Sequence, residues 1–422
     1  MSSRNKTTAT KGVATPALMP KLRFPEFRAA EGWDADALGD LANFVNEKVP
    51  LERVALENYV STENILPNYG GVVKASKMPA TGSVTRYRPN DTLVSNIRPY
   101  LKKVWVADKE GGASNDVIVI RAKHSLLPQY FSCTLKSDAF IDYVMTGAKG
   151  VKMPRGDVGS MKAYRLLYPS KAEQQKIAEC LSSVDELIVA QAQKVDVLKT
   201  HKKALMQQLF PGDGEAIPNL RLPEFKNSGK WAEMKLGDIG RVIRGASPRP
   251  KGDPRYYGGP VPRLMVQDVT RDGKWVTPRI DSLTMDGAKL SRPCKAGTLT
   301  IVCSGTVGVV SFLAVDACIH DGFLALIEID ESKAIKDFLY HSLSTLRLQF
   351  EEGATHGGVF TNLTTSGIQQ FSIKCPSPFE QQKISDCLSS IDDLITCENQ
   401  KLESLKSHKE GLMKQLFPSP TE

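Results

Sequence analysis

The sequence contains one stretch twice: EQQKIAECLSSVDELIVAQAQKVDVLKTHKKALMQQLFP at residues 173–211 and EQQKISDCLSSIDDLITCENQKLESLKSHKEGLMKQLFP at residues 380–418. The two copies align without a gap at an offset of 207 residues (380 minus 173), and about 24 of the 39 aligned positions are identical. Identity at this level within one chain identifies an internal repeat. The rest of the chain is therefore interpreted as two units attached to these two segments.

Apolar residues recur in both copies at alternating steps of four and three positions, the heptad pattern of a helix that packs against another helix. These seam residues are Ile177, Leu181, Val184, Ile188, Val195, Leu198, Leu205 and Leu209 in the first copy, and Ile384, Leu388, Ile391, Ile395, Leu402, Leu405, Leu412 and Leu416 in the second. Polar residues interrupt both seams at equivalent positions: Gln191 and Glu398, Lys202 and Lys409. Two independent surface helices are an alternative. The matching seams favour paired helices, and we expect them to be antiparallel because a large segment separates them.

Shorter motifs repeat ahead of each unit, at an offset of 198 residues (218 minus 20). They are PKLRFPEF at 20–27 and PNLRLPEF at 218–225, a tryptophan at 33 and 231, and Leu-Gly-Asp at 38–40 and 236–238. The segments that follow these motifs barely resemble each other, so a duplicated frame holds divergent contents. We expect an α+β fold in which two mixed α/β domains are separated by a pair of long antiparallel helices with pseudo-two-fold symmetry.

Strand-like and helix-like patterns occur in the same kind of order in the two segments. In the first segment we expect strands over 91–98, 103–107 and 116–121, a helix over 128–144 and a glycine-containing basic loop over 146–156. In the second we expect a hairpin of strands 299–303 and 307–315, a strand over 323–329, a helix over 337–350 and loops over 244–252 and 354–362.

Positive charge lies on the segments between the repeats rather than on the repeats. Residues 20–169 contain 21 Lys and Arg against 16 Asp and Glu, and residues 218–377 contain 20 against 16. The repeats are mildly acidic, with 6 against 7 over 170–217 and 5 against 8 over 378–422. This distribution suits globular units that face a polyanion and helices that face protein, although so modest a surplus is weak support by itself.

Motifs for catalysis and metal binding are missing from the sequence. It contains neither a phosphate-binding loop nor a dinucleotide-binding fingerprint, and its cysteines and histidines lack zinc spacing. His320 and Asp321 beside Cys318 could be drawn as a nucleophilic site, but no third group is suggested to orient them. We expect a structural role for this histidine.

DNA binding is the function that the polar residues of the two units favour. Cations can neutralise phosphates or contact guanine, and Asn, Gln, Ser and Thr can read base edges or bind phosphate. The candidates are Asn96, Arg98, Lys102, Lys103, Lys149, Lys152, Arg155, Arg244, Ser247, Arg249, Lys251, Gln267, Ser304, His356, Thr361 and Asn362. Any one of them is more often an ordinary surface residue, so the prediction rests on the grouping of cations in glycine-containing loops. The turn at Ser304 fits an anion-binding nest and a simple hairpin turn equally well.

The complete frame resembles the specificity subunit of type I restriction–modification systems. The resemblance rests on the Glu-Gln-Gln-Lys-Ile starts and Gln-Leu-Phe-Pro ends of the long repeats, on the short motifs ahead of each unit, and on residues 96–101 and 304–308. It spans nearly the whole chain after residue 19. The resemblance implies target recognition domains at 20–169 and 213–377 and helical spacers at 170–212 and 378–422. Residues 1–19, rich in Ser, Thr and Lys, are expected to form a disordered tail, with nonspecific contact to the DNA backbone as the alternative.

This resemblance implies a DNA-binding subunit without catalysis, cofactor or metal of its own. Each target recognition domain would read one half of an asymmetric bipartite site in double-stranded DNA. The helices would set the separation of the half-sites and dock two modification subunits, which would bind S-adenosylmethionine and methylate adenine. Restriction subunits, if added, would cleave the DNA. We expect a cytoplasmic protein that does not enter a membrane.

Two alternatives from other functional classes stay open at this point. A coiled-coil adaptor would not bind DNA, and salt-dependent DNA binding by the assembled complex would distinguish it. An autonomous DNA-acting enzyme would cut or methylate DNA alone. The sequence leaves open the target bases, the spacer length and whether a restriction subunit accompanies the system.

Overall fold

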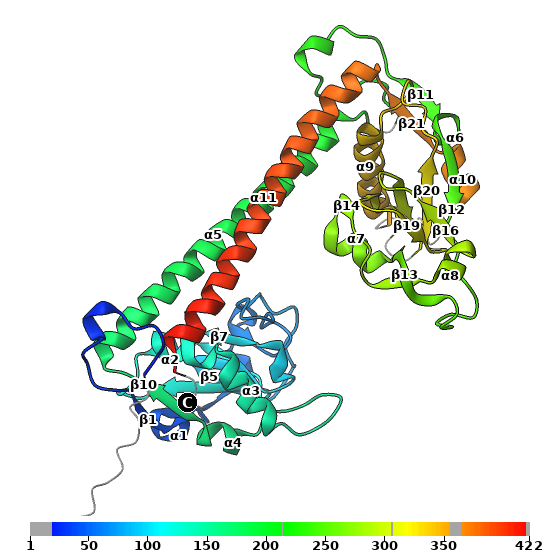
Figure 1. The fold of residues 1–422 in the computed structure, drawn as a ribbon. Coiled ribbons are helices and arrows are strands. Elements are labelled where there is room, and N and C mark those ends of the chain that lie inside the picture. Colours follow the sequence, from blue (N-terminus) through cyan, green and yellow to red (C-terminus); the bar gives the residue numbers. More distant parts are fainter. Residues whose placement is uncertain (1–18, 213, 305–306, 355–363, 419–422) are drawn as a thin grey trace, which may run out of the picture. The chain divides into compact units, whose positions relative to one another are not determined.

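A computed structural model describes residues 19–212, 214–304, 307–354 and 364–418 (Figure 1). The expected tail therefore lies outside the described residues, except for Met19. The chain forms two compact units, Met1–Ala192 with Lys401–Glu422 and Gln193–Gln400. Each unit combines a globular region with parts of two long helices. The units are described separately, and their globular parts are called the first region (residues 20–169) and the second region (residues 218–377).

The first region is built from short helices and from short strands, and the strands form three sheets. The strands are β1 (Asp34–Ala37), β2 (Ala42–Phe44), β3 (Lys48–Pro50), β4 (Tyr59–Val60), β5 (Ser83–Tyr87), β6 (Thr92–Ser95), β7 (Val104–Val106), β8 (Gly111–Ala113), β9 (Val117–Ala122) and β10 (Arg165–Tyr168). The α-helices are α1 (Leu38–Leu41), α2 (Pro128–Leu135), α3 (Asp138–Thr146) and α4 (Val158–Ala163), with 3-10 turns η1 (Pro25–Phe27), η2 (Leu51–Arg53), η3 (Leu56–Asn58) and η4 (Pro99–Leu101). The sheet orders are β2-β9-β6-β7, β3-β5-β8-β4 and β1-β10.

The second region has more strands in the same kind of arrangement. Its strands are β11 (Ala232–Lys235), β12 (Arg241–Arg244), β13 (Tyr257–Leu264), β14 (Trp275–Val276), β15 (Asp281–Leu283), β16 (Arg292–Cys294), β17 (Leu299–Val302), β18 (Val310–Leu313), β19 (Ala317–Ile319), β20 (Phe323–Ile327) and β21 (Ser372–Cys375). Its helices are η5 (Pro223–Phe225), α6 (Leu236–Ile239), α7 (Val266–Asp272), α8 (Met285–Lys289), α9 (Lys336–Ala354) and α10 (Thr365–Gln370). The sheet orders are β12-β20-β17-β18-β14, β15-β13-β19-β16 and β11-β21.

The two regions share a strand order although their sequences barely resemble each other. The antiparallel sheet β2-β9-β6-β7 of the first region corresponds to β12-β20-β17-β18 of the second. In each region the first strand pairs antiparallel with the last, β1 with β10 and β11 with β21. Strands that pack against a hydrophobic core tolerate many different apolar residues. The same topology can therefore persist while the sequence diverges.

Most of the elements expected from the sequence patterns are present at the predicted places. The predicted hairpin is confirmed, because β17 and β18 pair antiparallel with Ile301 opposite Val310. The helix expected over 128–144 is wrong in one respect, since it is interrupted between α2 and α3. Ser137 adopts an extended conformation there, and its hydroxyl accepts a hydrogen bond from the Phe140 N–H (3.2 Å). This N-cap begins a new helix where hydrophobic spacing alone indicated a continuous one.

The repeated stretches form two helices of 39 residues each, α5 (Lys171–Leu209) and α11 (Pro378–Leu416). All the seam residues are buried or half-buried. The buried ones are Ile177, Leu181, Val195, Leu209, Ile384, Leu388, Leu402 and Leu416. The half-buried ones are Val184, Ile188, Leu198, Leu205, Ile391, Ile395, Leu405 and Leu412.

The lysines that interrupt the seams form equivalent ion pairs in the two units. In the second unit the Lys202 ammonium lies 2.5 Å from the Asp392 carboxylate, and in the first unit Lys409 lies 2.6 Å from Asp185. Asp185 and Asp392 are themselves equivalent positions of the repeat, 207 residues apart. Each lysine therefore pairs with an aspartate of the other helix, and one contact occurs twice. Glu398, the other polar position of the second seam, is buried and pairs with Lys194 (3.0 Å) in the second unit.

The short motif ahead of each region is tied to the start of the following helix. Arg23 forms a bidentate ion pair with Glu173 (2.8 and 2.7 Å), and Arg221 forms the same pair with Glu380 (2.8 and 2.7 Å). All four side chains are at least 93% buried. Each arginine also donates to two backbone carbonyls, so four of its five N–H groups are engaged. Removal of one partner would leave an uncompensated buried charge, at a cost of roughly 3–5 kcal/mol.

The end of each long helix inserts a phenylalanine into an aromatic cluster. In the first unit the cluster contains Trp33, Tyr130 and Phe417, with ring centroids 5.7–6.3 Å apart. In the second unit it contains Trp231, Phe338 and Phe210, with centroids 5.5–6.1 Å apart. The tryptophans belong to the short motifs and Phe417 and Phe210 to the Gln-Leu-Phe-Pro ends. The motifs thus bind one globular region to the start of one helix and the end of the other.

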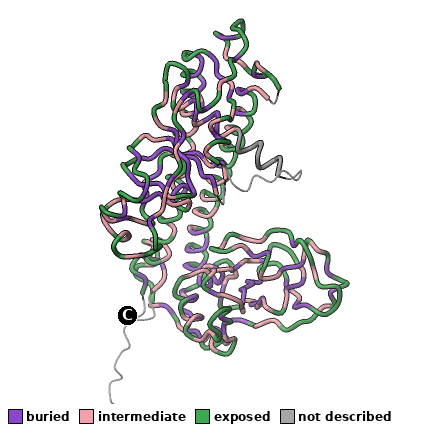
Figure 2. Tube along the Cα trace, turned by 90° about the vertical axis from the view of Figure 1, so that its right-hand side faces the viewer, coloured by how far each residue is buried: buried purple, intermediate pink, exposed green. Residues whose placement is uncertain are grey.

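Buried positions gather in the interior of each region, and exposed positions lie along its outside (Figure 2). In the first unit the main core extends from the sheet to Ile177, Leu181 and Leu416 of the long helices. In the second unit it extends to Leu209 and Ile384 in the same way. The globular regions and the helix segments of their units are therefore parts of common cores.

Candidate nucleic-acid interface

In the first region the candidate residues begin where β6 ends. Arg98 and Lys102 flank the turn η4 and both have positive φ, 51° and 53°. This conformation costs roughly 1–2 kcal/mol for a residue with a side chain, so the surrounding structure must impose it. The Arg98 N–H donates to the Pro154 carbonyl (2.8 Å), and the carbonyl of Lys102 accepts from the Tyr69 N–H (2.9 Å). The turn is thus held from both sides.

The basic loop between α3 and α4 joins this turn. The Gly156 N–H donates to the Asn96 carbonyl (3.1 Å), and Ile97 forms a β-bridge with Arg155. The structure thereby brings Asn96 and Arg98 together with Arg155, although more than fifty residues separate them in sequence. Asp116 supports both segments, since its carbonyl accepts from the Asn96 N–H (2.8 Å) and its carboxylate lies 3.2 Å from the Arg155 guanidinium.

Two buried polar atoms at this junction lack a hydrogen-bond partner among the residues that the structure describes: Oδ1 of Asn96 and Nε of Arg98. A buried polar group without a partner costs free energy and calls for an explanation. Together with the two residues at positive φ, these atoms make the junction strained and incompletely paired. Strain of this kind gathers at sites that hold a ligand.

The other cations of the first region are differently engaged. Lys102 forms an ion pair with Asp138 on α3 (2.6 Å), and Lys103 donates to the Thr62 carbonyl (2.6 Å). Lys149 lies in the basic loop, is mostly exposed and pairs with Asp157 (3.2 Å). Lys152 is exposed in the same loop. The loop cations are therefore available at the surface, whereas Lys103 is committed to a backbone contact.

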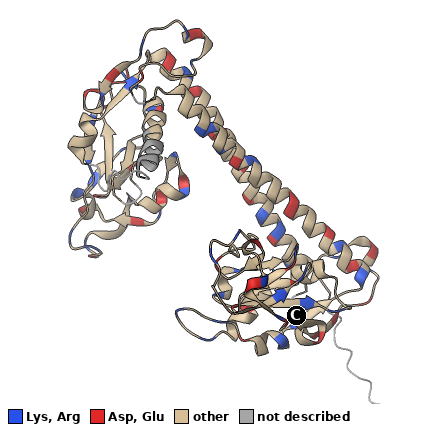
Figure 3. Ribbon diagram, turned by 180° about the vertical axis from the view of Figure 1, so that it is seen from behind, with Lys and Arg blue, Asp and Glu red and all other residues tan. Residues whose placement is uncertain are grey.

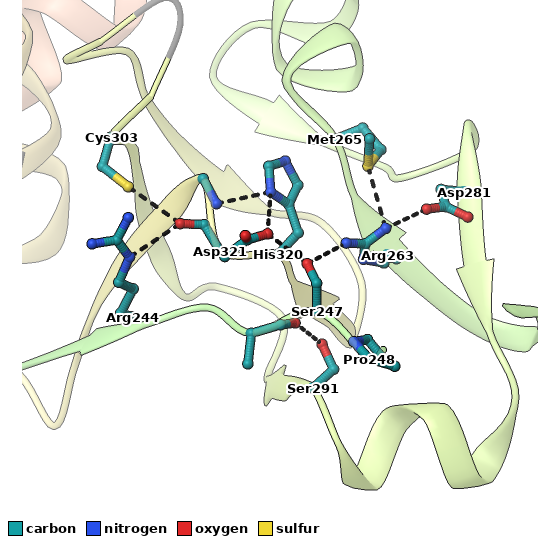
Figure 4. Close-up of polar contacts among 12 residues, drawn as sticks. Arg244, Ser247, Pro248, Arg263, Met265, Asp281, Ser291, Cys303, His320 and Asp321 are labelled. Atoms are coloured by element: carbon teal, nitrogen blue, oxygen red, sulfur yellow. Dashed lines mark hydrogen bonds and ion pairs between the residues drawn. The ribbon is translucent and has the colours of Figure 1, made fainter. Parts of the chain in front are cut away.

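In the second region the basic loop after β12 is arranged around Asp321 (Figure 4). The Ser247 hydroxyl donates to the Asp321 carboxylate (2.5 Å), and Arg244 Nε donates to the Asp321 carbonyl (3.1 Å). Arg249 lies 4.0 Å from the other carboxylate oxygen. The hydrogen bond from Ser247, with help from His320 and Arg249, lowers the pKa of Asp321 below its usual value. The carboxylate is therefore charged and contacts Ser247 and Arg249, while the Asp321 carbonyl holds Arg244.

Arg263 holds this loop in place through a contact with Ser247. It is 96% buried, donates to the Ser247 hydroxyl (2.6 Å) and pairs with Asp281 (2.5 Å). Its guanidinium lies over the Tyr257 ring, 5.4 Å from the centroid. Arg263 Nε is buried without a partner among the described residues, as Arg98 Nε is in the first region. A chain of contacts thus runs from Asp281 through Arg263 and Ser247 to Asp321 (Figure 4).

A glycine allows the loop to approach β19 and β20 closely. A Cβ atom at Gly245 would lie 2.0 Å from the His320 carbonyl oxygen, so no other residue fits there. The Gly245 N–H donates to the Phe323 carbonyl (2.9 Å), and the Ala246 N–H to the Ile319 carbonyl (3.1 Å). The glycine beside Arg244 is therefore explained by packing, and it holds the arginine at the edge of the sheet.

The remaining candidates of the second region are less closely connected to Asp321. Lys251 is exposed farther along the loop, and Gln267 is exposed on the first turn of α7. Ser304 follows β17 and is half-buried. Its side chain lies near Gly322, because a Cβ atom there would be 2.7 Å from Ser304 Oγ. His356, Thr361 and Asn362 lie outside the described residues.

His320 has structural contacts that account for its presence. Its Nδ1 accepts a hydrogen bond from the Gly322 N–H (2.8 Å), and its ring packs edge-on against Phe323. Burial, reinforced by Arg263, lowers the pKa of His320. Within the part of the chain that the structure describes, no three His, Cys, Asp or Glu side chains are grouped as metal ligands. No helix among those residues is long and apolar enough to cross a membrane.

Asp321, Arg263 and Asp116 organise the two surfaces, and sequence reasoning singled out none of them for DNA binding. Asp321 attracted attention only beside His320, as part of a doubtful nucleophilic site. A lone arginine in an apolar strand pattern was the one available signal for Arg263, since a buried cation requires partners. Figure 3 shows basic and acidic positions interspersed on both regions. The organising carboxylates are therefore part of the basic surfaces.

Comparison with known families places these surfaces in context. A family model described as the type I restriction modification DNA specificity domain matches the chain twice, over residues 30–200 and 228–407. Each match covers one globular region and most of the long helix that follows it. The duplicated frame and the duplicated family match therefore coincide.

Individual relatives agree with this match. The specificity subunit of the type I restriction enzyme HindI from Haemophilus influenzae is 21% identical over 451 aligned positions, which cover 89% of this chain and 97% of that one. The MjaIX specificity subunit from Methanocaldococcus jannaschii is 27% identical over 191 residues, only 44% of either chain. A crystal structure of a type I restriction–modification S subunit from M. genitalium superposes with a TM-score of 0.57 at 18% identity, covering 95% of this chain and all of that one. At this identity the structural likeness concerns the fold.

Proposed function

The chain belongs to the family of type I restriction–modification DNA specificity subunits, and on this basis we propose that its two regions read the two halves of one asymmetric, bipartite DNA site. The observation that carries the proposal is the pairing of a duplicated frame with unlike basic surfaces. The motif contacts of Arg23 and Arg221 are the same in both units, whereas the candidate surfaces at Arg98 and Arg244 are built differently. Identical attachment contacts combined with differently built candidate surfaces suit a protein that binds two different DNA sequences.

The proposed domains follow the repeats. Target recognition domains occupy residues 20–169 and 213–377, and helical spacers occupy 170–212 and 378–422. Contacts to DNA would be of two kinds. Exposed cations such as Lys149, Lys152 and Lys251 would bind phosphates, and residues held in fixed positions, such as Ser247, would read base edges.

We infer that α5 and α11 form one continuous antiparallel pair with pseudo-two-fold symmetry. The inference is supported by the equivalent ion pairs Lys202–Asp392 and Lys409–Asp185, one in each unit. In the second unit Lys194 pairs with Glu398 and Lys202 with Asp392, so residue numbers rise along α5 as they fall along α11, as antiparallel packing requires. Such a pair would hold the two domains at a fixed separation and so set the length of the spacer in the DNA site.

The partners would be two methyltransferase subunits that bind S-adenosylmethionine and methylate adenine, joined in some assemblies by restriction subunits that cleave DNA. A duplicated docking surface is supported by Leu187 and Leu394, equivalent positions of the repeat that are both exposed, by 56% and 43%. Exposed leucines at equivalent positions would offer two partners the same contact. The chain itself would be non-catalytic, and the complex would act on double-stranded DNA in the cytoplasm.

Methylome sequencing tests this function directly. The chain would be co-expressed with its methyltransferase subunit in a host that lacks DNA methylation. Methylated adenines should then lie in one motif with two specified halves and an unspecified spacer of constant length. Methylation at a single undivided motif, or none with an intact methyltransferase, would contradict the proposal. Omission of the chain should abolish methylation and serves as the control.

A further inference from the structure

The basic loop of the first region, between α3 and α4, is a short hairpin. The Lys149 N–H donates to the Arg155 carbonyl (2.9 Å), and the Arg155 N–H donates to the Lys149 carbonyl (2.9 Å). These reciprocal bonds form an antiparallel bridge, and residues 150–154 form the turn. Gly150 has a φ of +97°, a value that glycine adopts readily. Figure 1 shows this segment extending away from the rest of the first region.

The base of the hairpin is firmly attached. Pro154 is buried and its carbonyl accepts from the Arg98 N–H, while Gly156 donates to the Asn96 carbonyl. A Cβ atom at Gly156 would lie 2.4 Å from Met161 Cε and 2.9 Å from Val144 Cγ1, so this close packing depends on glycine. The hairpin therefore projects from a base that is bonded to the strained turn at Arg98.

The tip combines exposed apolar side chains with cations. Val151 is fully exposed and Met153 is half exposed. Lys152 lies between them and is exposed, and Lys149 and Arg155 follow on the two sides of the stem. An apolar side chain that is fully exposed gains nothing from folding, because the hydrophobic contribution requires removal from water. The tip is therefore built to contact something outside the chain.

The charge and shape of the hairpin favour one kind of occupant. Three cations within seven residues favour a polyanion, and a two-stranded ribbon fits the major groove of B-DNA. Val151 and Met153 cannot interact favourably with phosphates. They can pack against base edges, because the thymine methyl group and the ring carbons are apolar. Lys149 pairs with Asp157 and Arg155 pairs with Asp116, at 3.2 Å each, and both pairs are exposed. These cations can therefore replace a carboxylate partner with a phosphate without being buried.

We propose that the hairpin 149–155 enters the major groove of the half-site read by the first region, with Val151 and Met153 against base edges and Lys149, Lys152 and Arg155 on the flanking phosphates. The proposal rests on the proposed function and adds to it the element and the residues that discriminate among bases. The apolar tip supplies sequence preference, and the cations supply affinity that does not depend on sequence.

Two variants separate these roles. The tip variant is Val151→Ser with Met153→Ser, and the cation variant is Lys149→Ala with Lys152→Ala. Both change exposed side chains, so unaltered melting temperatures should verify folding. Val73→Ser, at another exposed valine of the first region, is the matched control. Each chain is assembled with its methyltransferase subunits. Binding is then measured to the methylome-defined duplex, to duplexes altered in one half-site and to an unrelated duplex, over a range of salt concentrations.

We expect the tip variant to bind the cognate duplex about tenfold more weakly, the range of one mismatched base pair, with unchanged binding to the unrelated duplex and an unchanged salt slope. Its discrimination should fall at one half-site only. The cation variant should weaken binding to both duplexes and reduce the slope of log affinity against log salt by roughly 2. The Val73 control should match the wild type.

Three results would overturn the proposal. Unchanged cognate binding by the tip variant would exclude a base contact, and an equal loss on cognate and unrelated duplexes would assign the tip to the backbone. A DNA bend seen by energy transfer between the duplex ends, present with the wild type and lost with the tip variant, would instead indicate a wedge in the minor groove. Failure of the proposed function is distinguishable, because the wild-type complex itself would then prefer neither half-site.

Discussion

His341 illustrates how a single buried side chain makes the second unit sensitive to acid. The residue is completely buried on α9, with Nε2 3.4 Å from the Ser389 hydroxyl and Nδ1 without a partner among the described residues. Burial, followed by the charges of Lys202 and Lys274, lowers the pKa of His341 to about 2. Both lysines have acidic partners, Asp392 and Asp337. The imidazole is therefore neutral in the folded protein at any pH at which DNA is bound.

The sign of the resulting pH dependence follows from linkage. The pKa of histidine in the unfolded chain is about 6.5. Below that pH His341 binds a proton in the unfolded state but not in the folded state. The stability due to neutral His341 is complete above pH 6.5 and is lost progressively as the pH falls towards 2. The loss is about 1.4 kcal/mol per pH unit. We expect the wild type to lose roughly 2 kcal/mol more than His341→Gln between pH 6.5 and pH 4.5.

Urea unfolding curves at a series of pH values measure this difference. The relevant quantity is the slope of the unfolding free energy against pH, so a lower starting stability of His341→Gln does not disturb the comparison. His408→Gln, at an exposed histidine of α11, is the matched control for the change from histidine to glutamine. Parallel slopes for the wild type and His341→Gln would show that the imidazole is charged in the folded state after all.

At the scale of single residues, the sequence predicted some of the groupings that the structure shows among the candidate DNA-binding residues. Arg244, Ser247 and Arg249 lie together in the structure, and so do Asn96, Arg98 and Arg155. The first grouping lies within one predicted glycine-containing loop, whereas the second joins segments more than fifty residues apart and appears only in the structure. The residues that fix their positions were not predicted, because Arg263 and Asp281 act through contacts between strands distant in sequence. Local sequence carries no record of such a contact.

In the long helices, polar residues within the apolar seam fix the register of packing. Lys202 and Asp392 are 85% and 78% buried as side chains, and the same contact recurs between Lys409 and Asp185. A charge at such a position is tolerated only opposite its partner, so the pair disfavours other registers more than it stabilises the correct one. A one-turn slip of either helix would leave a half-buried lysine without its aspartate.

A charge exchange tests this register. Lys202→Asp alone places two carboxylates together, and we expect it to destabilise the protein by roughly 1–3 kcal/mol, between the values for exposed and buried pairs. Lys202→Asp with Asp392→Lys restores an ion pair and should recover most of the loss. Lys202→Asp with Asp185→Lys has the same composition but joins residues from different pairs, and it should not recover. Urea unfolding of all variants gives the coupling energies. Equal stability of the two double variants would contradict the register.

At the scale of elements, periodicity predicted the long helices and the main strands because these signals are local. It missed the break at Ser137, where one hydroxyl capping the next helix outweighed continuous hydrophobic spacing. It also gave no reason for the repeated Arg, Trp and Phe of the motifs. Those residues meet only when the start of one helix and the end of the other reach the same region. Their function became clear from Arg23 with Glu173 and from Trp33 with Phe417.

In the whole molecule, the contacts that hold the two globular regions are alike, whereas the candidate DNA-binding surfaces of the two regions are built differently. Each region is held by an ion pair and an aromatic cluster whose residues belong to the repeats, apart from Tyr130 in the first unit and Phe338 in the second. A region could therefore be replaced if its substitute supplies an aromatic ring at that place and a backbone N–H for the Gln381 side chain, as Ile335 does. We therefore expect sequence specificity to be separable from assembly of the complex.

Exchange of residues 236–377 for the corresponding segment of another family member tests this separability. The exchange retains Arg221, Trp231 and Glu380, so the ion pair and most of the aromatic cluster are unaffected. We expect methylome sequencing to reveal a motif with one half replaced, the other half unchanged and the spacer length constant. The reciprocal exchange of residues 38–169 should replace the other half. A change in both halves after either exchange would mean that the regions influence each other's reading. A changed spacer would mean that the regions, and not the helices, determine the separation of the half-sites.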